Sequence, residues 1–266
     1  MRWLLVLCGV LAWMPGVAFA AADLYRSRAV VTGEGEAERA RGFALCLEDV
    51  LAKVSGDPRL AHDPAVAAVT ARAADLVAGF DYHDRMSGIP VHDEQGTRER
   101  PFDLTVTFDR AKIDAALRSL GRRPWPEPRP VLAVLLAVRD AIAAYVLAAD
   151  GARGEGQREA LQAAAERRGV VAVLPGSALL AAQHLDAAGL KALPPPRLAA
   201  AAKASGGEAA LAGTLVWSET APGWTAHWRL SWHGKPHRWQ IAGVSFDDAF
   251  RTGIDGAVAI LSAQPR

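Results

Sequence analysis

Cysteine is almost absent from this chain of 266 residues, which contains only Cys8 and Cys46. We expect Cys8 to be removed with the start of the chain, so the mature protein keeps one thiol and forms no internal disulfide. Its stability must therefore come from a packed core, for which 51% hydrophobic residues are ample.

The chain also lacks an excess of charge of either sign, with 30 Lys and Arg residues against 29 Asp and Glu. It contains no long basic run. Binding to nucleic acid or to an anionic membrane surface depends on clustered Lys and Arg. We therefore predict neither nucleic acid nor a membrane surface as a partner.

Long hydrophobic runs are missing except at the start. The apolar run at residues 3–14 follows Arg2 and precedes a Pro-Gly pair, with small residues at Ala18 and Ala20. A run of this length is shorter than the ~20 residues that span a bilayer, and its flanks are typical of a secretory signal. The alternative is a membrane anchor. We predict a cleaved signal peptide at residues 1–20 and a periplasmic mature protein without a membrane span.

Proline is concentrated at residues 122–130 (RRPWPEPRP), which carry four of them. Proline removes a backbone donor and fixes φ, so this stretch is neither a helix nor a central strand. We interpret it as an extended linker between an N-terminal domain, residues 21–121, and a C-terminal domain, residues 131–266.

The N-terminal domain is predicted to be α+β, in the order β-α-α-β-β-α. Apolar residues at three- and four-residue spacing predict a first helix, and Gly56 is expected to end it. Alternation from Phe102 to Phe108 indicates a half-buried strand. The expected strands are residues 24–32, 80–91 and 102–108, and the helices 34–54, 64–78 and 111–120.

The C-terminal domain is predicted to be an α/β three-layer-like module ending in an antiparallel meander plus a helix. A continuous apolar run at residues 131–138 is typical of a strand covered on both faces. Residues 176–206 are Ala-rich and helical in parts, interrupted by three prolines. The remaining expected strands are 142–148, 170–174, 209–218, 224–232 and 237–244, and the helices 157–168 and 246–261.

Tryptophan is abundant near the end of the chain. Trp224, Trp228 and Trp232 share one face of a predicted strand, whose other face carries Thr225, His227, Arg229 and Ser231. Such a row of rings is either a platform for a glycan or peptide, or the core side of a sheet beneath the final helix. We favour the core, because a half-buried sheet normally hides its apolar face.

No catalytic constellation is visible. Ser177 lacks the G-x-S-x-G elbow, Cys46 lies on or beside an apolar helix stripe, and the Asp247-Asp248 pair is expected to favour the start of the last helix. One polar hairpin gathers possible metal ligands without ligand spacing: Asp81, His83, Asp84, His92, Asp93 and Glu94. We predict no catalytic residue, no metal and no cofactor.

Several segments resemble an uncharacterised bacterial family, domain of unknown function 2066. They are residues 50–57 (VLAKVSGD), residues 104–109 (LTVTFD), the Trp125/Pro130 linker, and Trp239…Gly243 before residues 255–257. The resemblance implies an exported envelope protein of Gram-negative bacteria with no assigned activity, and it supplies no site residues.

Residues 131–266 are similar, more loosely, to α/β modules of periplasmic assembly factors such as the amino-terminal domain of the Tol translocation protein and the curli-secretion lipoprotein. The likeness lies in element order and in residues 210–214 (ALAGT). It concerns the fold and transfers no function.

These observations favour a non-enzymatic binding or assembly module of the cell envelope, with another envelope protein as its partner. One alternative is a peptidoglycan- or glycan-binding protein that uses the Trp-rich sheet. Another is an envelope hydrolase whose acid and base come from residues distant in sequence. No feature of the sequence sets the oligomeric state.

Overall fold

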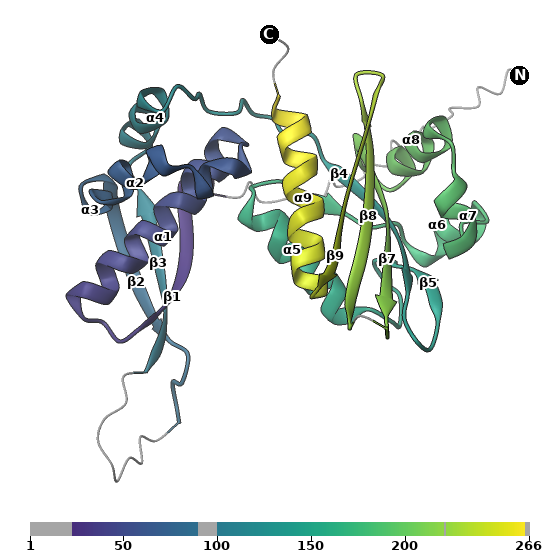
Figure 1. Cartoon of the computed structure of the whole chain (residues 1–266), viewed down its shortest axis with the longest axis horizontal. Coiled ribbons are helices and arrows are strands. Elements are labelled where there is room, and N and C mark those ends of the chain that lie inside the picture. Colours follow the sequence, from purple (N-terminus) through teal and green to yellow (C-terminus); the bar gives the residue numbers. More distant parts are fainter. Residues whose placement is uncertain (1–22, 90–99, 221, 264–266) are drawn as a thin grey trace, which may run out of the picture.

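The computed structural model describes residues 23–89, 100–220 and 222–263, so the expected signal peptide lies outside the described residues. The fold is mixed α+β, as expected, with a three-stranded and a six-stranded sheet. Figure 1 shows the sheets side by side, with helix α9 (Phe246–Ser262) between them.

The first sheet is antiparallel, in the order β1-β3-β2. Its strands are β1 (Arg26–Thr32), β2 (Val77–Asp84) and β3 (Pro101–Phe108). Helix α1 (Glu36–Ser55) packs on one face, and the apolar stripes of α1 and β3 join one buried cluster. Gly56 ends α1 in the left-handed conformation (φ 68°), as predicted. The other helices here are η1 (Pro58–His62), α2 (Pro64–Thr70), α3 (Ala73–Leu76) and α4 (Arg110–Ser119).

Two predicted boundaries in this part are wrong. The helix expected at residues 64–78 is broken into α2 and α3 and gives way to β2 at Val77, because pairing with β3 starts there. Strand β2 ends at Asp84, although the extended run was expected to continue to residue 91. The Asp84 carboxylate accepts the N–H of Met86 at 2.8 Å and so turns the chain.

The Pro-rich segment at residues 122–130 is extended, but it is also packed. Trp125 is buried, and its backbone N–H donates to the Val54 carbonyl at 2.8 Å. The Arg129 guanidinium lies 4.5 Å from the centroid of the Trp125 ring and donates to the carbonyls of Val54, Arg168 and Gly169. The segment is therefore fixed against the elements on both sides of it.

The second sheet has the order β5-β4-β7-β8-β9, and a short sixth strand pairs with β4. Strand β4 is parallel to β6 and β7, and the other pairs are antiparallel. All of β4 except Arg139 is buried, as its apolar sequence predicts. The strands are β4 (Leu132–Arg139), β5 (Ala144–Val146), β6 (Ala172–Val173), β7 (Ala209–Ser218), β8 (Gly223–Trp232) and β9 (Lys235–Val244).

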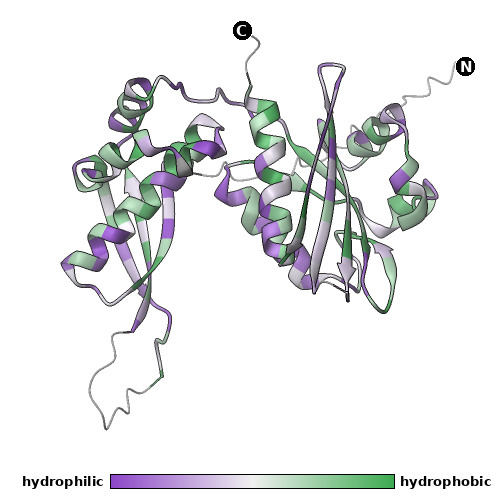
Figure 2. Cartoon of the chain, in the orientation of Figure 1, coloured by the Kyte–Doolittle hydropathy of each residue, from purple (hydrophilic) through white to green (hydrophobic). Residues whose placement is uncertain are grey.

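Helices cover both faces of this sheet and make three layers. Helices α5 (Glu155–Arg167) and α9 share the larger core with one face, and Figure 2 shows hydrophobic residues on both the strands and α9. The other face holds α6 (Ser177–Ala182), α7 (Ala187–Ala192) and α8 (Pro195–Ala204), which pack mainly on β4 and β7. Much of β8 and β9 therefore stays open on this second face.

The prolines at 194–196 form the start of helix α8. Pro194 is the N-cap of α8, and Pro195 and Pro196 are its first residues. Proline suits the first turn because no intrahelical partner exists for an N–H there. Within the part of the chain that the structure describes, no helix has both the length and the apolarity needed to cross a membrane.

Candidate functional site

The tryptophan face of β8 packs beneath α9. Trp228 is 2% exposed and belongs to the large core. A Cβ added at Gly213 or Gly253 would lie 2.5 or 2.6 Å from its ring, so both glycines make room for the indole. A ligand has no open ring face at Trp228 on which to stack.

The neighbouring rings are tied to the same core. Trp224 and Trp232, the other two platform candidates, are half-buried and pack against it. The indole N–H of Trp239 donates to the Thr252 carbonyl of α9 at 3.0 Å, and a Cβ at Gly256 would lie 2.4 Å from this ring. These contacts explain why the faces of β8 and β9 beneath α9 are so rich in tryptophan.

The opposite face of the same strands is hollowed into a groove of about 920 Å³ between α7 and the sheet. Five of its lining residues carry basic side chains, and none of them carries a carboxylate. The basic residues are Arg139, Lys191, His227, Arg229 and Arg238. We call this feature the basic groove, and it is the candidate functional site.

The sheet register brings the groove residues together from separate strands. Thr214 of β7 lies opposite His227 of β8, which lies opposite Gln240 of β9. Two residues further along β8, Arg229 lies opposite Arg238 of β9. Side chains on facing positions of adjacent strands share a face, so the floor of the groove combines hydroxyl, imidazole, amide and guanidinium groups.

Arg229 holds the wall of the groove in place. Its guanidinium donates to the carbonyls of Leu190 and Leu193, at 2.6 and 3.0 Å, where α7 ends. Burial lowers the pKa of Arg229, and the positive charge of Arg238 lowers it further. Two guanidinium groups thus face each other across adjacent strands, an unfavourable arrangement unless an anion offsets it.

Three other cations of the groove have no carboxylate partner among the residues that the structure describes. Arg139, Lys191 and Arg238 are exposed, and none of them forms an ion pair with any residue in the described ranges. Guanidinium and ammonium groups bind carboxylate and phosphate oxygens through charge-assisted hydrogen bonds. The groove is therefore suited to an anionic ligand.

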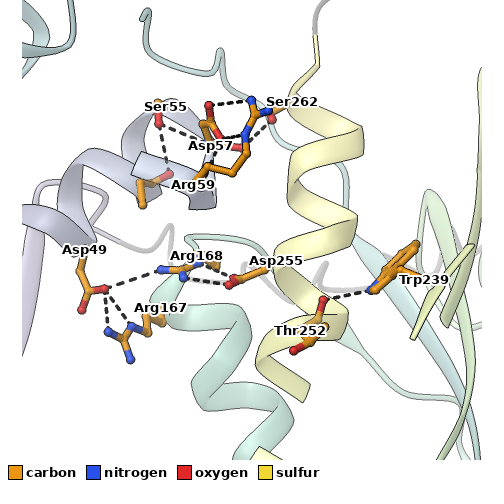
Figure 3. A network of polar contacts seen from close by, with 12 residues as sticks. Asp49, Ser55, Asp57, Arg59, Arg167, Arg168, Trp239, Thr252, Asp255 and Ser262 are labelled. Atoms are coloured by element: carbon orange, nitrogen blue, oxygen red, sulfur yellow. Dashed lines mark hydrogen bonds and ion pairs between the residues drawn. The ribbon is translucent and has the colours of Figure 1, made fainter. Parts of the chain in front are cut away.

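A second polar cluster joins the parts that carry the two sheets (Figure 3). Arg168, whose side chain is 8% exposed, forms ion pairs with Asp255 of α9 at 2.5 Å and Asp49 of α1 at 3.6 Å. Arg167 also pairs with Asp49, at 2.8 Å, and the Ser262 hydroxyl donates to the Gly56 carbonyl at 2.6 Å. Because each carboxylate here is paired with an arginine, this cluster stabilises the contact and offers no free acid or base.

The side chains considered above for catalysis lie at positions that serve the fold. Burial, followed by the charge of Asp49, raises the pKa of the Cys46 thiol to about 12, so the unreactive protonated form prevails at neutral pH. Ser177 begins α6, where its N–H donates to Asp150. Asp247 and Asp248 lie in the first turn of α9.

The possible metal ligands on the first hairpin are spread out. Asp84 pairs with Arg100 at 3.2 Å, whereas Asp81 and His83 are exposed on β2. The other three candidates, His92, Asp93 and Glu94, lie outside the described residues. Among the residues that the structure places, no three His, Cys, Asp or Glu side chains come together to hold a metal ion.

Comparison with known proteins corrects the expected family. Residues 18–126 match a different family, described as domain of unknown function (DUF8605). The resemblance to domain of unknown function 2066 is therefore wrong, although residues 50–57 and 104–109, on which it partly rested, lie inside the matched range. No curated protein and no solved structure matches the chain, so the looser likeness of residues 131–266 to periplasmic assembly modules has no counterpart among solved structures.

The sequence pattern predicts the tryptophan face but not the groove. The alternation of Thr225, His227 and Arg229 with the tryptophans already placed them on the opposite face. Arg238 and Gln240 alternate in the same way with Trp239. The missing signal was the register of β9, which decides that Arg238 faces Arg229.

Proposed function

We propose that this protein is an exported, non-enzymatic binding module of the bacterial cell envelope that holds an anionic partner in the basic groove. The observation that carries the proposal is a groove with five basic residues and no carboxylate among its lining residues. The matched family has no described activity, so the groove alone supports this choice.

Binding suits the groove better than catalysis. Arginine and lysine groups are protonated at neutral pH and hold anions without exchanging protons. His227 is the one histidine among the lining residues, which include neither a cysteine nor a carboxylate. General acid–base or nucleophilic catalysis usually needs a second such group. The burial of the Trp228 ring favours the anionic partner over the glycan alternative, which needs an open ring face.

Export rests on the amino-terminal segment, residues 1–20, with its basic start, short apolar run and small residues before the expected cleavage site. Fractionation of the native host, with the protein detected by a carboxy-terminal tag, tests this part. We expect the shortened chain in the periplasmic fraction. Recovery of the full-length chain from the cytosol would contradict export.

A photo-crosslinking residue at Gln240 tests the role of the groove in living cells. We expect a discrete adduct from Gln240, which lines the groove, and its loss when Arg139→Gln and Arg238→Gln are combined in the same chain. The same crosslinker at the exposed Arg118 of α4 serves as the control position. Equal adducts from both positions, or none from Gln240, would show that the groove is not the contact site.

A further inference from the structure

Two of the cations that form no ion pair within the described residues, Arg139 and Arg238, lie at opposite ends of the groove floor. Arg139 of β4 is in register with Val216 and, through it, with Thr225 of β8. Arg238 of β9 is in register with Arg229, four residues further along β8. The two residues are three strands apart across the sheet and four residues apart along it. Their Cα atoms are therefore about 20 Å apart.

The floor between these ends combines small apolar residues, such as Ala137 and Val216, with polar side chains. Thr214, Thr225 and Gln240 supply hydroxyl and amide groups, and exposed His227 lies at its centre. Hydroxyl and amide groups both donate and accept hydrogen bonds. They therefore match the alternating N–H and C=O groups of an extended backbone.

We infer that the groove binds an extended segment of a partner protein with Asp or Glu near both ends, an inference that rests on the proposed function. A segment of about six extended residues spans about 20 Å, which is the separation of the Cα atoms of Arg139 and Arg238. At one end its carboxylates meet Arg139, and at the other they meet Arg238 beside Arg229. Such a carboxylate also offsets the repulsion between these two facing guanidinium groups.

Two other anionic ligands fit less well. A single phosphate is too small to contact both ends of the floor. Sugars are commonly held by open aromatic rings, but the rings nearest the groove belong to Trp228, which is buried beneath α9, and Trp239, whose indole N–H is bonded to α9. An acidic peptide uses both the charged ends and the hydrogen-bonding floor.

The test is fluorescence anisotropy with a labelled eight-residue peptide that carries two Glu residues at each end and Ser and Thr between them. The comparison peptide has Gln in place of every Glu. Binding is measured to the mature protein, to Arg139→Gln/Arg238→Gln, and to Arg72→Gln/Arg118→Gln. The last variant removes the same charge from exposed positions outside the groove. Circular dichroism verifies that all three proteins are folded.

We expect the acidic peptide to bind about tenfold more weakly to the groove variant, and within about twofold of the parent protein to the control variant. The Gln peptide should bind to neither variant, and added salt should weaken the binding of the acidic peptide. Failure of the acidic peptide to bind, or equal binding to both variants, overturns the inference.

Short-chain polyphosphate and an anionic glycan, used as competitors, separate this inference from the proposed function. Groove-dependent binding of either one without binding of the peptide would overturn the peptide assignment and leave the groove as an anion site. If no anion binds and Gln240 yields no adduct in cells, the proposed function fails as well.

Discussion

The two faces of the six-stranded sheet are built from the same strands and have opposite chemistry. On the α9 side, Trp228 is buried between two glycines. On the α7 side, its chain neighbours His227 and Arg229 line the basic groove. A period of two along β8 thus alternates core residues with candidate ligand-binding residues.

The difference follows from how much helix covers each face. Helix α9 presents buried residues along its length to one face, which requires apolar partners from β7, β8 and β9. Helices α6, α7 and α8 pack mainly on β4 and β7, and the uncovered part of the sheet tolerates charge because it contacts water. Substitutions on the first face should therefore change stability, and substitutions on the second should mainly change binding.

The largest expected effect is from Trp228→Ala. Removing a buried indole leaves a cavity beneath α9, and we expect the free energy of unfolding to fall by about 3–5 kcal/mol in urea denaturation. Trp217→Ala is the control. Because Trp217 is 37% exposed, this substitution should lower the free energy of unfolding by about 1 kcal/mol or less. Similar losses for both variants would contradict the contrast between a buried and an exposed ring.

A smaller loss is expected from Gly253→Ala, which adds one methyl group against the Trp228 ring. The new Cβ would lie 2.6 Å from the indole, so the helix or the ring must move. This movement should lower the free energy of unfolding by about 1–3 kcal/mol. Gly156→Ala in α5 is the matched control, because the closest atom to its new Cβ is 4.0 Å away. It should raise stability by up to about 1 kcal/mol, since alanine favours a helix. Thermal unfolding of both variants measures the difference in sign.

Much of this contrast could be predicted from the sequence, because local patterns decide it. Alternation in β8 placed Trp224, Trp228 and Trp232 on one face, and the stripe from Phe246 to Leu261 predicted the helix that covers them. The three strands of the meander and the buried character of β4 also follow from local periodicity and from the absence of charge.

The groove could not be predicted, because it depends on contacts between residues far apart in the chain. Arg139 reaches the site through the pairing of β4 with β7, and Lys191 through the packing of the short helix α7. Neither of these contacts leaves a signal in the local sequence. A near-neutral total charge also conceals the groove, since charge is gathered there by folding and not by a basic run.

A third test separates the two arginines that face each other in the groove. Arg229→Met should lower the free energy of unfolding by about 1–2 kcal/mol, because the carbonyls of Leu190 and Leu193 lose their donor. Arg238→Gln should leave the melting temperature unchanged or raise it, since it removes the facing positive charge. Differential scanning calorimetry without added anions measures both effects. A loss for Arg238→Gln as large as that for Arg229→Met would mean that Arg238 also has a structural role.

The smallest effect on folding is expected from His227→Gln, which changes an exposed side chain at the centre of the groove floor. The free energy of unfolding should change by less than about 0.5 kcal/mol, because the imidazole supports no packed element. His227 lies between the two charged ends, so we expect His227→Gln to weaken binding of the acidic peptide less than Arg139→Gln/Arg238→Gln does. Fluorescence anisotropy with the same peptide measures this difference, because Arg139 and Arg238 are unchanged in the His227→Gln protein. If the parent and the variant bind the peptide equally, the ligand does not contact the centre of the floor, and the two charged ends alone hold it.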